Sequence, residues 1–158
     1  MKNLKIEIKW AIIFVLMMLV WMSLERLFGL HDTYIEKHPV FTNFVAIPAI
    51  AIYVLALLDK RDNFYQGKMT YLQGLVCGLI ITMIVTIFSP LTQVITSLVI
   101  TPHYFQNAID YAVTEGKMTQ AAAEEYFNLK NYIIQGLIGA PIMGLLTSIV
   151  VAIFTRKK

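Results

Sequence analysis

The sequence predicts an all-α integral membrane protein, a four-helix bundle with a short helical cap on its outer side. Hydrophobic residues make up 58% of the 158 positions, above the share of roughly 45–50% found in ordinary soluble domains. They concentrate in four runs, each long enough to cross a hydrocarbon core about 30 Å thick. Lys and Arg gather on alternate connections between the runs, as expected when successive connections lie on opposite faces of a membrane.

The four runs predict a single membrane domain over residues 1–158. The expected spans are about 10–30, 40–58, 70–100 and 131–154. The first run has 15 uncharged residues before Glu25, and the apolar residues that follow Arg26 extend it to crossing length. Trp10 and Trp21 bracket this run and no small-residue cleavage pattern follows it, so we expect a retained span and not a cleaved signal peptide.

The distribution of basic residues predicts the orientation of the chain. Nine of the 13 Lys and Arg residues fall on one predicted side, namely Lys2, Lys5, Lys9, Lys60, Arg61, Lys68, Arg156, Lys157 and Lys158. Because cytoplasmic connections are enriched in Lys and Arg, we expect both termini in the cytoplasm of a bacterium and the spans in its inner membrane. The net charge of +3 does not predict a nucleic-acid partner, since the basic residues form no single patch.

Residues 102–130 are expected to form an outer helical segment between the third and fourth spans. Thr101 followed by Pro102 favours a helix start, with a hydroxyl N-cap and proline at the first helical position. Gly116 is a plausible stop for that helix, and Thr119 is expected to begin a second one.

Three prolines lie inside the expected spans, at Pro48, Pro90 and Pro141. Proline removes a backbone donor and crowds the preceding turn, so we expect each of them to kink its helix. Proline is also ordinary in membrane helices, because neighbouring hydroxyls can satisfy the freed carbonyl groups. The kinks alone therefore do not predict transport.

Small and polar side chains recur every three or four residues in the third and fourth spans, which places them along one face of each helix. The candidate helix-packing residues are Gly74, Gly78, Gly136, Ala140, Gly144 and Ser148. A set in the third span, here called the polar stripe, is the candidate polar pathway and consists of Thr82, Thr86, Ser89, Gln93 and Thr96. We favour packing of the two spans over a pathway, because small residues at this spacing are common at helix contacts in membranes.

Glu25 and Arg26 are a candidate charged interfacial site, since they are the only charges that interrupt an apolar run. Ionisable groups within membrane segments are costly and often functional, which makes Glu25 a candidate for proton or cation coupling. Their place near the outer end of the first span favours the alternative, a pair that reaches the headgroup region and anchors the span.

An outer cluster of His31, Asp32, His38 and His103 offers side chains that can bind a metal ion. These residues have no recognised ligand spacing, so the sequence predicts no metal and no cofactor. It also contains no nucleophile elbow, phosphate-binding loop or metalloprotease helix motif, and therefore predicts no enzyme. The hypothesis of a metal-dependent enzyme at the outer surface is supported only by the presence of these histidines.

Several strings of the sequence resemble the bacterial membrane-protein family catalogued as domain of unknown function 4199. These strings are Trp21 to Asp32, Phe41 to Pro48, Gly67 to Gly74, Ser89 to Gln93 and Gly116 to Thr119. The resemblance covers nearly the whole chain and implies a compact protein that usually has four spans. It implies no activity, ligand or catalytic residue.

Together these observations predict a non-catalytic, multi-pass inner-membrane protein in contact with the lipid bilayer. We expect it to act through helix–helix association, either with itself as a homo-oligomer or with another membrane protein. The alternative is a small homo-oligomeric transporter or channel. Four spans can hardly enclose a hydrophilic pathway alone, so that alternative requires an oligomer whose shared interface contains the polar stripe.

Overall fold

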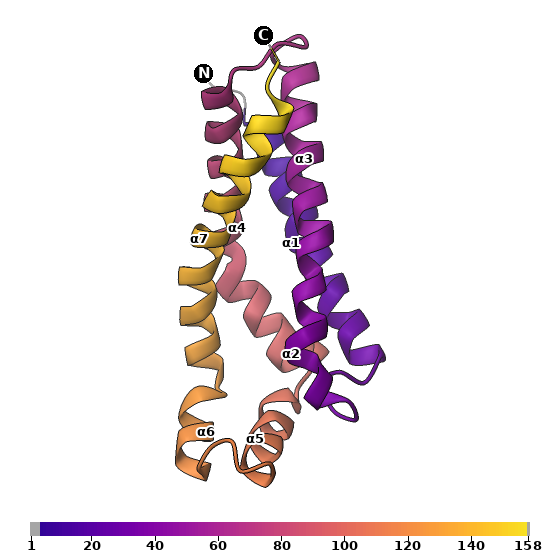
Figure 1. The fold of residues 1–158 in the computed structure, drawn as a ribbon, viewed down its shortest axis with the longest axis vertical. Coiled ribbons are helices and arrows are strands. Elements are labelled where there is room, and N and C mark those ends of the chain that lie inside the picture. Colours follow the sequence, from indigo (N-terminus) through magenta and orange to yellow (C-terminus); the bar gives the residue numbers. More distant parts are fainter. Residues whose placement is uncertain (1–3, 158) are drawn as a thin grey trace.

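Four long helices form the body of the protein in a computed structural model that describes residues 4–157 (Figure 1). They are α1 (Lys5–Leu27), α3 (Ala46–Asn63), α4 (Tyr71–Ile95) and α7 (Leu129–Thr155). Four stretches are long and apolar enough to cross a membrane, at Lys5–Leu27, Ile35–Asn63, Tyr71–Ile100 and Leu129–Thr155. The prediction of an all-α bundle with four candidate spans is therefore confirmed.

Short helices complete the chain at one end of the bundle. The segments η1 (Ile35–Lys37), α2 (His38–Phe41) and η2 (Thr42–Val45) lead into α3, and α5 (Tyr104–Thr114) and α6 (Gln120–Tyr126) lie between α4 and α7. We call this end the cap end. The opposite end, here the termini end, holds Leu4, Lys157 and the connection from α3 to α4 (Figure 1). There Met69 and Lys157 exchange two backbone hydrogen bonds of 2.8 and 2.9 Å.

The boundaries of the cap helices are partly as predicted. Thr119 accepts a hydrogen bond from the backbone of Ala122 and caps α6, and Gly116 adopts the positive φ of 65° that ends α5. The predicted start at Thr101 is wrong, because α5 begins only at Tyr104. The last turn of α4 widens into a π-helical segment, and Thr101 donates its N–H to the carbonyl of Thr96 at 2.7 Å instead of capping α5.

The prolines differ in their effect on the helices. Pro90 lies inside α4 and Pro141 inside α7. The Ser89 hydroxyl donates to the carbonyl of Thr86 at 2.9 Å, and this is the carbonyl that loses its helical partner because of Pro90. The expected kink at Pro48 stays a prediction: Pro48 is the third residue of α3 and closely follows the 3-10 segment η2, where the α-helical hydrogen-bond pattern is interrupted. In the first turn proline removes no intrahelical hydrogen bond.

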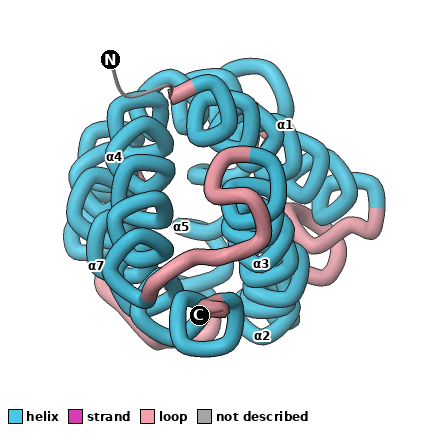
Figure 2. Tube along the Cα trace, turned by 90° about the horizontal axis from the view of Figure 1, so that it is seen from above, coloured by secondary structure: helices cyan, strands magenta, loops and turns pink. Residues whose placement is uncertain are grey.

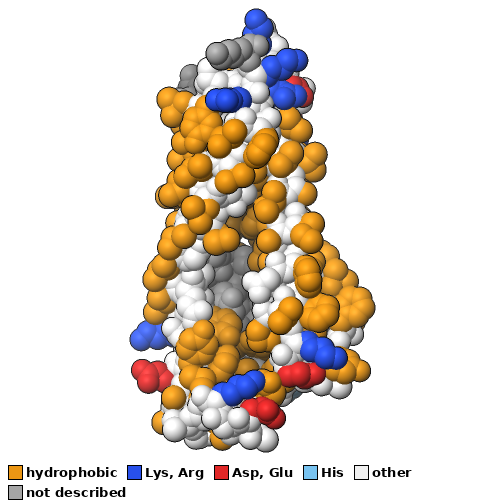
Figure 3. Space-filling model, in the orientation of Figure 1, with side chains coloured by type: hydrophobic (Ala, Val, Ile, Leu, Met, Phe, Trp, Pro, Cys, Tyr) orange, Lys and Arg blue, Asp and Glu red, His pale blue; other side chains and the backbone are white. Residues whose placement is uncertain are grey.

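The most extensive helix contact joins α4 to α7, and α1 packs against both α4 and α3. Figure 2, which views the bundle from above, shows α4 and α7 on one side and α1 and α3 on the other. The four helices meet in an apolar core toward the termini end, which includes Ala11, Leu57, Ile81 and Val151. Toward the cap end α7 separates from α3 and α4, and the surface between α3 and α7 is hollowed there (Figure 3).

Large apolar side chains cover the outside of the long helices, with charged side chains near both ends (Figure 3). Leu16, Ile87 and Phe154 are examples, with 56%, 69% and 80% of their surface exposed. An apolar surface this extensive would be unfavourable in water. On four membrane-spanning helices it implies contact with the lipid bilayer.

Candidate functional site

The chain turns back directly after α1 and places His31 against the buried carboxylate of Glu25. Gly29 has a φ of 74°, a conformation that glycine adopts without steric cost. The Leu30 N–H then donates to the carbonyl of Glu25 at 2.9 Å. His31 comes to lie against Glu25 in this way, and His38 approaches from the start of α2. Glu25, His31 and His38 are here called the cap-end cluster.

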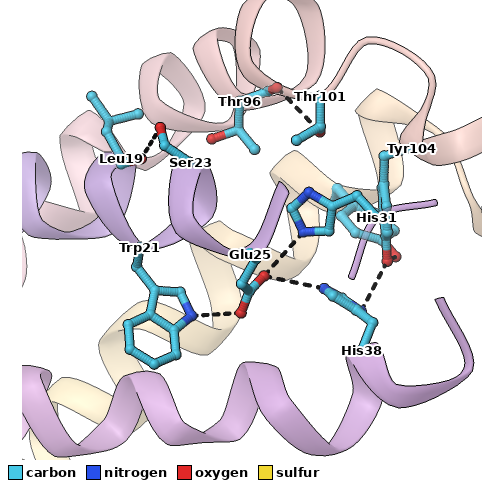
Figure 4. A network of polar contacts seen from close by, with 10 residues as sticks. Leu19, Trp21, Ser23, Glu25, His31, His38, Thr96, Thr101 and Tyr104 are labelled. Atoms are coloured by element: carbon cyan, nitrogen blue, oxygen red, sulfur yellow. Dashed lines mark hydrogen bonds and ion pairs between the residues drawn. The ribbon is translucent and has the colours of Figure 1, made fainter. Parts of the chain in front are cut away.

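The three side chains of the cap-end cluster converge on one carboxylate oxygen (Figure 4). His31 Nε2 lies 3.0 Å and His38 Nε2 lies 3.4 Å from Glu25 Oε2. The other oxygen, Oε1, accepts a hydrogen bond of 2.5 Å from Trp21 Nε1. Glu25 is 2% and His31 3% exposed, so the group lies inside the protein.

Tyrosines from two other helices close the cluster on its far side. The Tyr104 hydroxyl lies 3.5 Å from His38 Nδ1 and 3.3 Å from the Tyr132 hydroxyl. The rings of His31, His38 and Tyr104 have their centroids 5.1 to 5.2 Å apart. Burial raises the pKa of Tyr104 above its usual value, so the phenol keeps its proton and can act as donor or acceptor. The cap-end cluster and these two tyrosines together connect α1, α2, α5 and α7.

Only part of the predicted outer cluster comes together. His31 and His38 meet, whereas Asp32 and His103 are exposed and lie outside the group that could hold a metal ion. The two members of the candidate interfacial site lie in different surroundings: Arg26 is exposed and donates to the carbonyl of Ile100, whereas Glu25 is buried. Adjacent residues on a helix point about 100° apart, so the two side chains face different surroundings.

The small residues of α4 and α7 face one another across the closest helix contact. A Cβ added to Gly78 would lie 2.8 Å from Ser148 Cβ, and one added to Gly144 would lie 2.9 Å from Thr82 Cβ. Contacts this short do not occur between real side chains, so both positions require glycine. A Cβ at Gly74 would lie 3.2 Å from Met69 Cε, which is tighter than most real contacts, and 3.4 Å from Ala152 Cβ.

Further toward the cap end, the same face of α7 opens into an interior cavity of about 510 Å³ between the long helices. Gly136 and Ala140 line this cavity, as does Gly139. A Cβ at Gly136 would lie 3.7 Å from Ser89 Oγ, and one at Gly139 would have no atom within 4 Å. Gly144 borders the cavity as well as the close contact, so packing loosens along this face of α7 toward the cap end.

Only part of the polar stripe of α4 lies along the interior cavity. Thr82, Ser89 and Gln93 line the interior cavity, together with Thr42, Asn43, Thr92, Gln135 and Thr147. Thr86 donates to the carbonyl of Thr82 at 2.8 Å and Thr96 is buried at the end of α4; neither is among the lining residues. The Thr82 hydroxyl also lies 2.7 Å from the Tyr53 hydroxyl.

A second buried charged group lies at the termini end. Lys60 Nζ is 2.9 Å from Glu7 Oε1, and both residues are nearly inaccessible, at 4% and 2% exposure. The ammonium group of Lys60 also lies 3.7 Å from the centroid of the Phe64 ring. A neighbouring, more exposed pair joins Lys9 to Asp59. These contacts fasten the start of α1 to the end of α3.

Comparison with known proteins agrees with the resemblance found in the sequence. Residues 9–157 match the model of a family described as a protein of unknown function, DUF4199. The chain belongs to the DUF4199 family. Neither curated proteins nor solved structures provide a match. The DUF4199 family brings no defined activity, so the function must be argued from the geometry of the chain.

Two features of this DUF4199 protein were not predicted from its sequence. One is the buried pair of Glu7 and Lys60 at the termini end, and the other is the contact of Glu25 with His31 and His38. A helical spacing could have revealed the first: Glu7 precedes Ala11 and Phe14 by four and seven residues, and both lie in or against the core. The second had a weaker signal. Glu25 and His31 belong to a helix and a loop, and no periodicity relates a helix to the loop that follows it.

Proposed function

We propose that the chain is a non-catalytic, multi-pass protein of the bacterial inner membrane that acts by associating with a second copy of itself. The observation that carries this proposal is the interior cavity, which is open on the face between α3 and α7 (Figure 3). The hydroxyls of Ser89 and Thr92 bond to carbonyls of their own helix, but an exposed amide at membrane depth, such as that of Gln135, is unfavourable against hydrocarbon unless another polar group pairs with it. A helix surface of this kind favours contact with another protein over contact with lipid.

The residues around the cavity suit self-association. Gly136, Gly139 and Ala140 leave room for a helix backbone to approach closely. Gln135 is exposed beside them, and its amide offers donors as well as an acceptor, so it can pair with the same residue of a second copy. A two-fold interface requires a surface that is complementary to itself, and small residues flanked by amides meet that requirement.

We propose further that both termini lie in the cytoplasm. The termini end carries most of the basic residues of the described chain, at Lys5, Lys9, Lys60, Arg61, Lys68, Arg156 and Lys157. The cap end carries acidic residues beside its lysines (Figure 3). The cytoplasmic enrichment of Lys and Arg then orients the cap end outward. That no catalytic motif occurs in the sequence supports a non-catalytic role.

The lining of the interior cavity favours a second candidate function, a small homo-oligomeric transporter or channel. Thr82, Ser89 and Gln93 bring polar groups to a space between the long helices, which is where transport sites of membrane proteins are built. A continuous pathway in such a small protein would have to be shared between copies. Flux of candidate solutes into liposomes that contain the purified protein, measured with and without Gln93→Leu, separates this function from association alone.

Cysteine cross-linking in native membranes tests self-association. In a Cys77→Ser background, Gly139→Cys is expected to form a disulfide-linked dimer after mild oxidation, because Gly139 faces the proposed interface. Ile138→Cys is the matched control: it lies at the same depth on α7 and is 58% exposed, but is not among the cavity-lining residues. Cross-linking of Ile138→Cys alone, or of neither variant, would contradict the proposal.

A further inference from the structure

The cap-end cluster has the composition and geometry of a transition-metal site. Two imidazoles and a carboxylate are a common set of protein ligands for zinc. One ligand atom from each of Glu25, His31 and His38 can be chosen so that all three lie within 4.8 Å of one another. A zinc ion with bonds of about 2.0–2.2 Å in tetrahedral geometry holds its ligand atoms about 3.3–3.6 Å apart.

The observed separations are close to that requirement. Glu25 Oε2 lies 3.0 Å from His31 Nε2 and 3.4 Å from His38 Nε2, each within about 0.3 Å of a tetrahedral edge. The ligand atoms of the two histidines also lie within 4.8 Å of each other. The helix end, the Gly29 turn and the start of α2 thus hold three ligands in nearly the right place.

A second, independent observation is that each histidine has a buried ring nitrogen without a hydrogen-bond partner among the described residues. These are His31 Nδ1 and His38 Nε2, of which only the second faces Glu25, since His31 contacts that carboxylate through its Nε2. His38 Nε2 lies 3.4 Å from Glu25 Oε2, which is an ion-pair distance, but the two atoms do not form a hydrogen bond. Buried polar atoms are nearly always paired, and this contact between an imidazole nitrogen and a carboxylate oxygen lacks the geometry of a good hydrogen bond. A metal ion between them satisfies both groups.

The surroundings support metal binding in two further ways. His38 Nδ1 faces the Tyr104 hydroxyl at 3.5 Å, and ligating histidines usually have their second nitrogen held by such a neighbour. Glu25 also lines a cavity of about 400 Å³ beside the end of α1, together with Trp21 and Lys37. That cavity places open space beside the residue that carries the carboxylate.

From this geometry we propose that Glu25, His31 and His38 form a binding site for a divalent transition-metal ion, with Zn²⁺ as the representative ion. The three protein ligands leave a fourth position for a solvent molecule or a small anion. The bound ion fastens α1 to α2 and, through Tyr104, to the cap. This inference is independent of self-association, because the cluster lies outside the proposed interface.

Metal titration of the full chain tests the proposal. The protein is purified through a histidine-free tag, stripped with a chelator and titrated with Zn²⁺ and with Co²⁺ in detergent micelles. One ion per chain is expected, with the intense visible absorption of low-symmetry four-coordinate Co²⁺. His38→Gln is expected to weaken binding by at least about tenfold. His103→Gln, the matched control at an exposed histidine of the same end, is expected to bind as the unaltered protein does.

X-ray absorption at the zinc edge of the loaded, unaltered protein keeps the test decisive if a variant does not fold. Two imidazole ligands and one or two oxygen ligands are the expected result. Failure of the unaltered protein to bind Zn²⁺ would overturn the proposal. Equal loss of binding in His103→Gln, or an ion without imidazole ligands, would also overturn it. None of these outcomes bears on the cross-linking of Gly139→Cys.

Discussion

At the scale of single residues, the approach of α4 to α7 depends on the absence of two side chains. Gly78 meets Ser148 and Gly144 meets Thr82 at distances that leave no room for a methyl group. The hydroxyls at this contact bond to their own helices: Ser148 donates to Gly144 at 2.6 Å and Thr82 to Gly78 at 2.9 Å. Glycine here therefore allows both close packing and satisfied polar groups.

Alanine substitutions should separate tight glycines from open ones. Gly78→Ala is expected to lower the free energy of unfolding by about 1–3 kcal/mol, because the new methyl group forces two backbones apart. Gly139→Ala should be nearly neutral, since nothing lies within 4 Å of its Cβ position. Denaturation in mixed detergent micelles measures both changes. Equal losses in the two variants would contradict the assignment of Gly78 to a close contact.

The buried pair of Glu7 and Lys60 should contribute more than its exposed neighbours. Glu7→Gln is expected to cost about 3–5 kcal/mol of stability, because it leaves a buried ammonium group without its carboxylate. Lys9→Met, which removes the half-exposed partner of Asp59, should cost no more than about 1 kcal/mol. The same denaturation assay compares the two, and Glu7→Gln with Lys60→Met should recover part of the loss. A larger loss for Lys9→Met would refute this ranking.

At the scale of whole helices, α4 continues past a proline because a neighbouring hydroxyl replaces the lost donor. Ser89 donates to the Thr86 carbonyl that Pro90 leaves without an amide partner. Beyond this point α4 runs toward the cap end, away from α7 (Figure 1). The divergence of the two helices creates the space that becomes the interior cavity.

A double-mutant cycle tests the link between Ser89 and Pro90. Ser89→Ala alone should cost about 1 kcal/mol, because it leaves a carbonyl unsatisfied. In a Pro90→Ala background the same change should cost much less, since the introduced alanine would donate its own backbone N–H to the Thr86 carbonyl. The coupling energy from unfolding measurements reports the difference. Additive effects would show that the Ser89 hydroxyl serves another purpose.

At the scale of the whole molecule, the features that follow from local patterns were predictable from the sequence. Hydropathy located all four spans, and the spacing of Gly78 and Gly144 marked the faces that meet. The cap-end cluster was not predictable in this way. Glu25 had an interfacial position in the chain, and its burial depends on the return of the loop through Gly29. Likewise, Lys60 contributed only to the predicted orientation of the chain, and nothing in the pattern of charges indicated that its side chain is buried against Glu7.

The orientation of the whole chain is tested by labelling single cysteines with a maleimide that does not cross membranes. In a Cys77→Ser background, Asp62→Cys reports on the termini end and Glu115→Cys on the cap end; both sites are exposed. Acidic positions are chosen because replacing them barely alters the distribution of Lys and Arg that sets topology. Glu115→Cys should be labelled in intact spheroplasts, and Asp62→Cys only after the membrane is permeabilised. The opposite pattern would place the cap end, and with it Glu25, His31 and His38, in the cytoplasm.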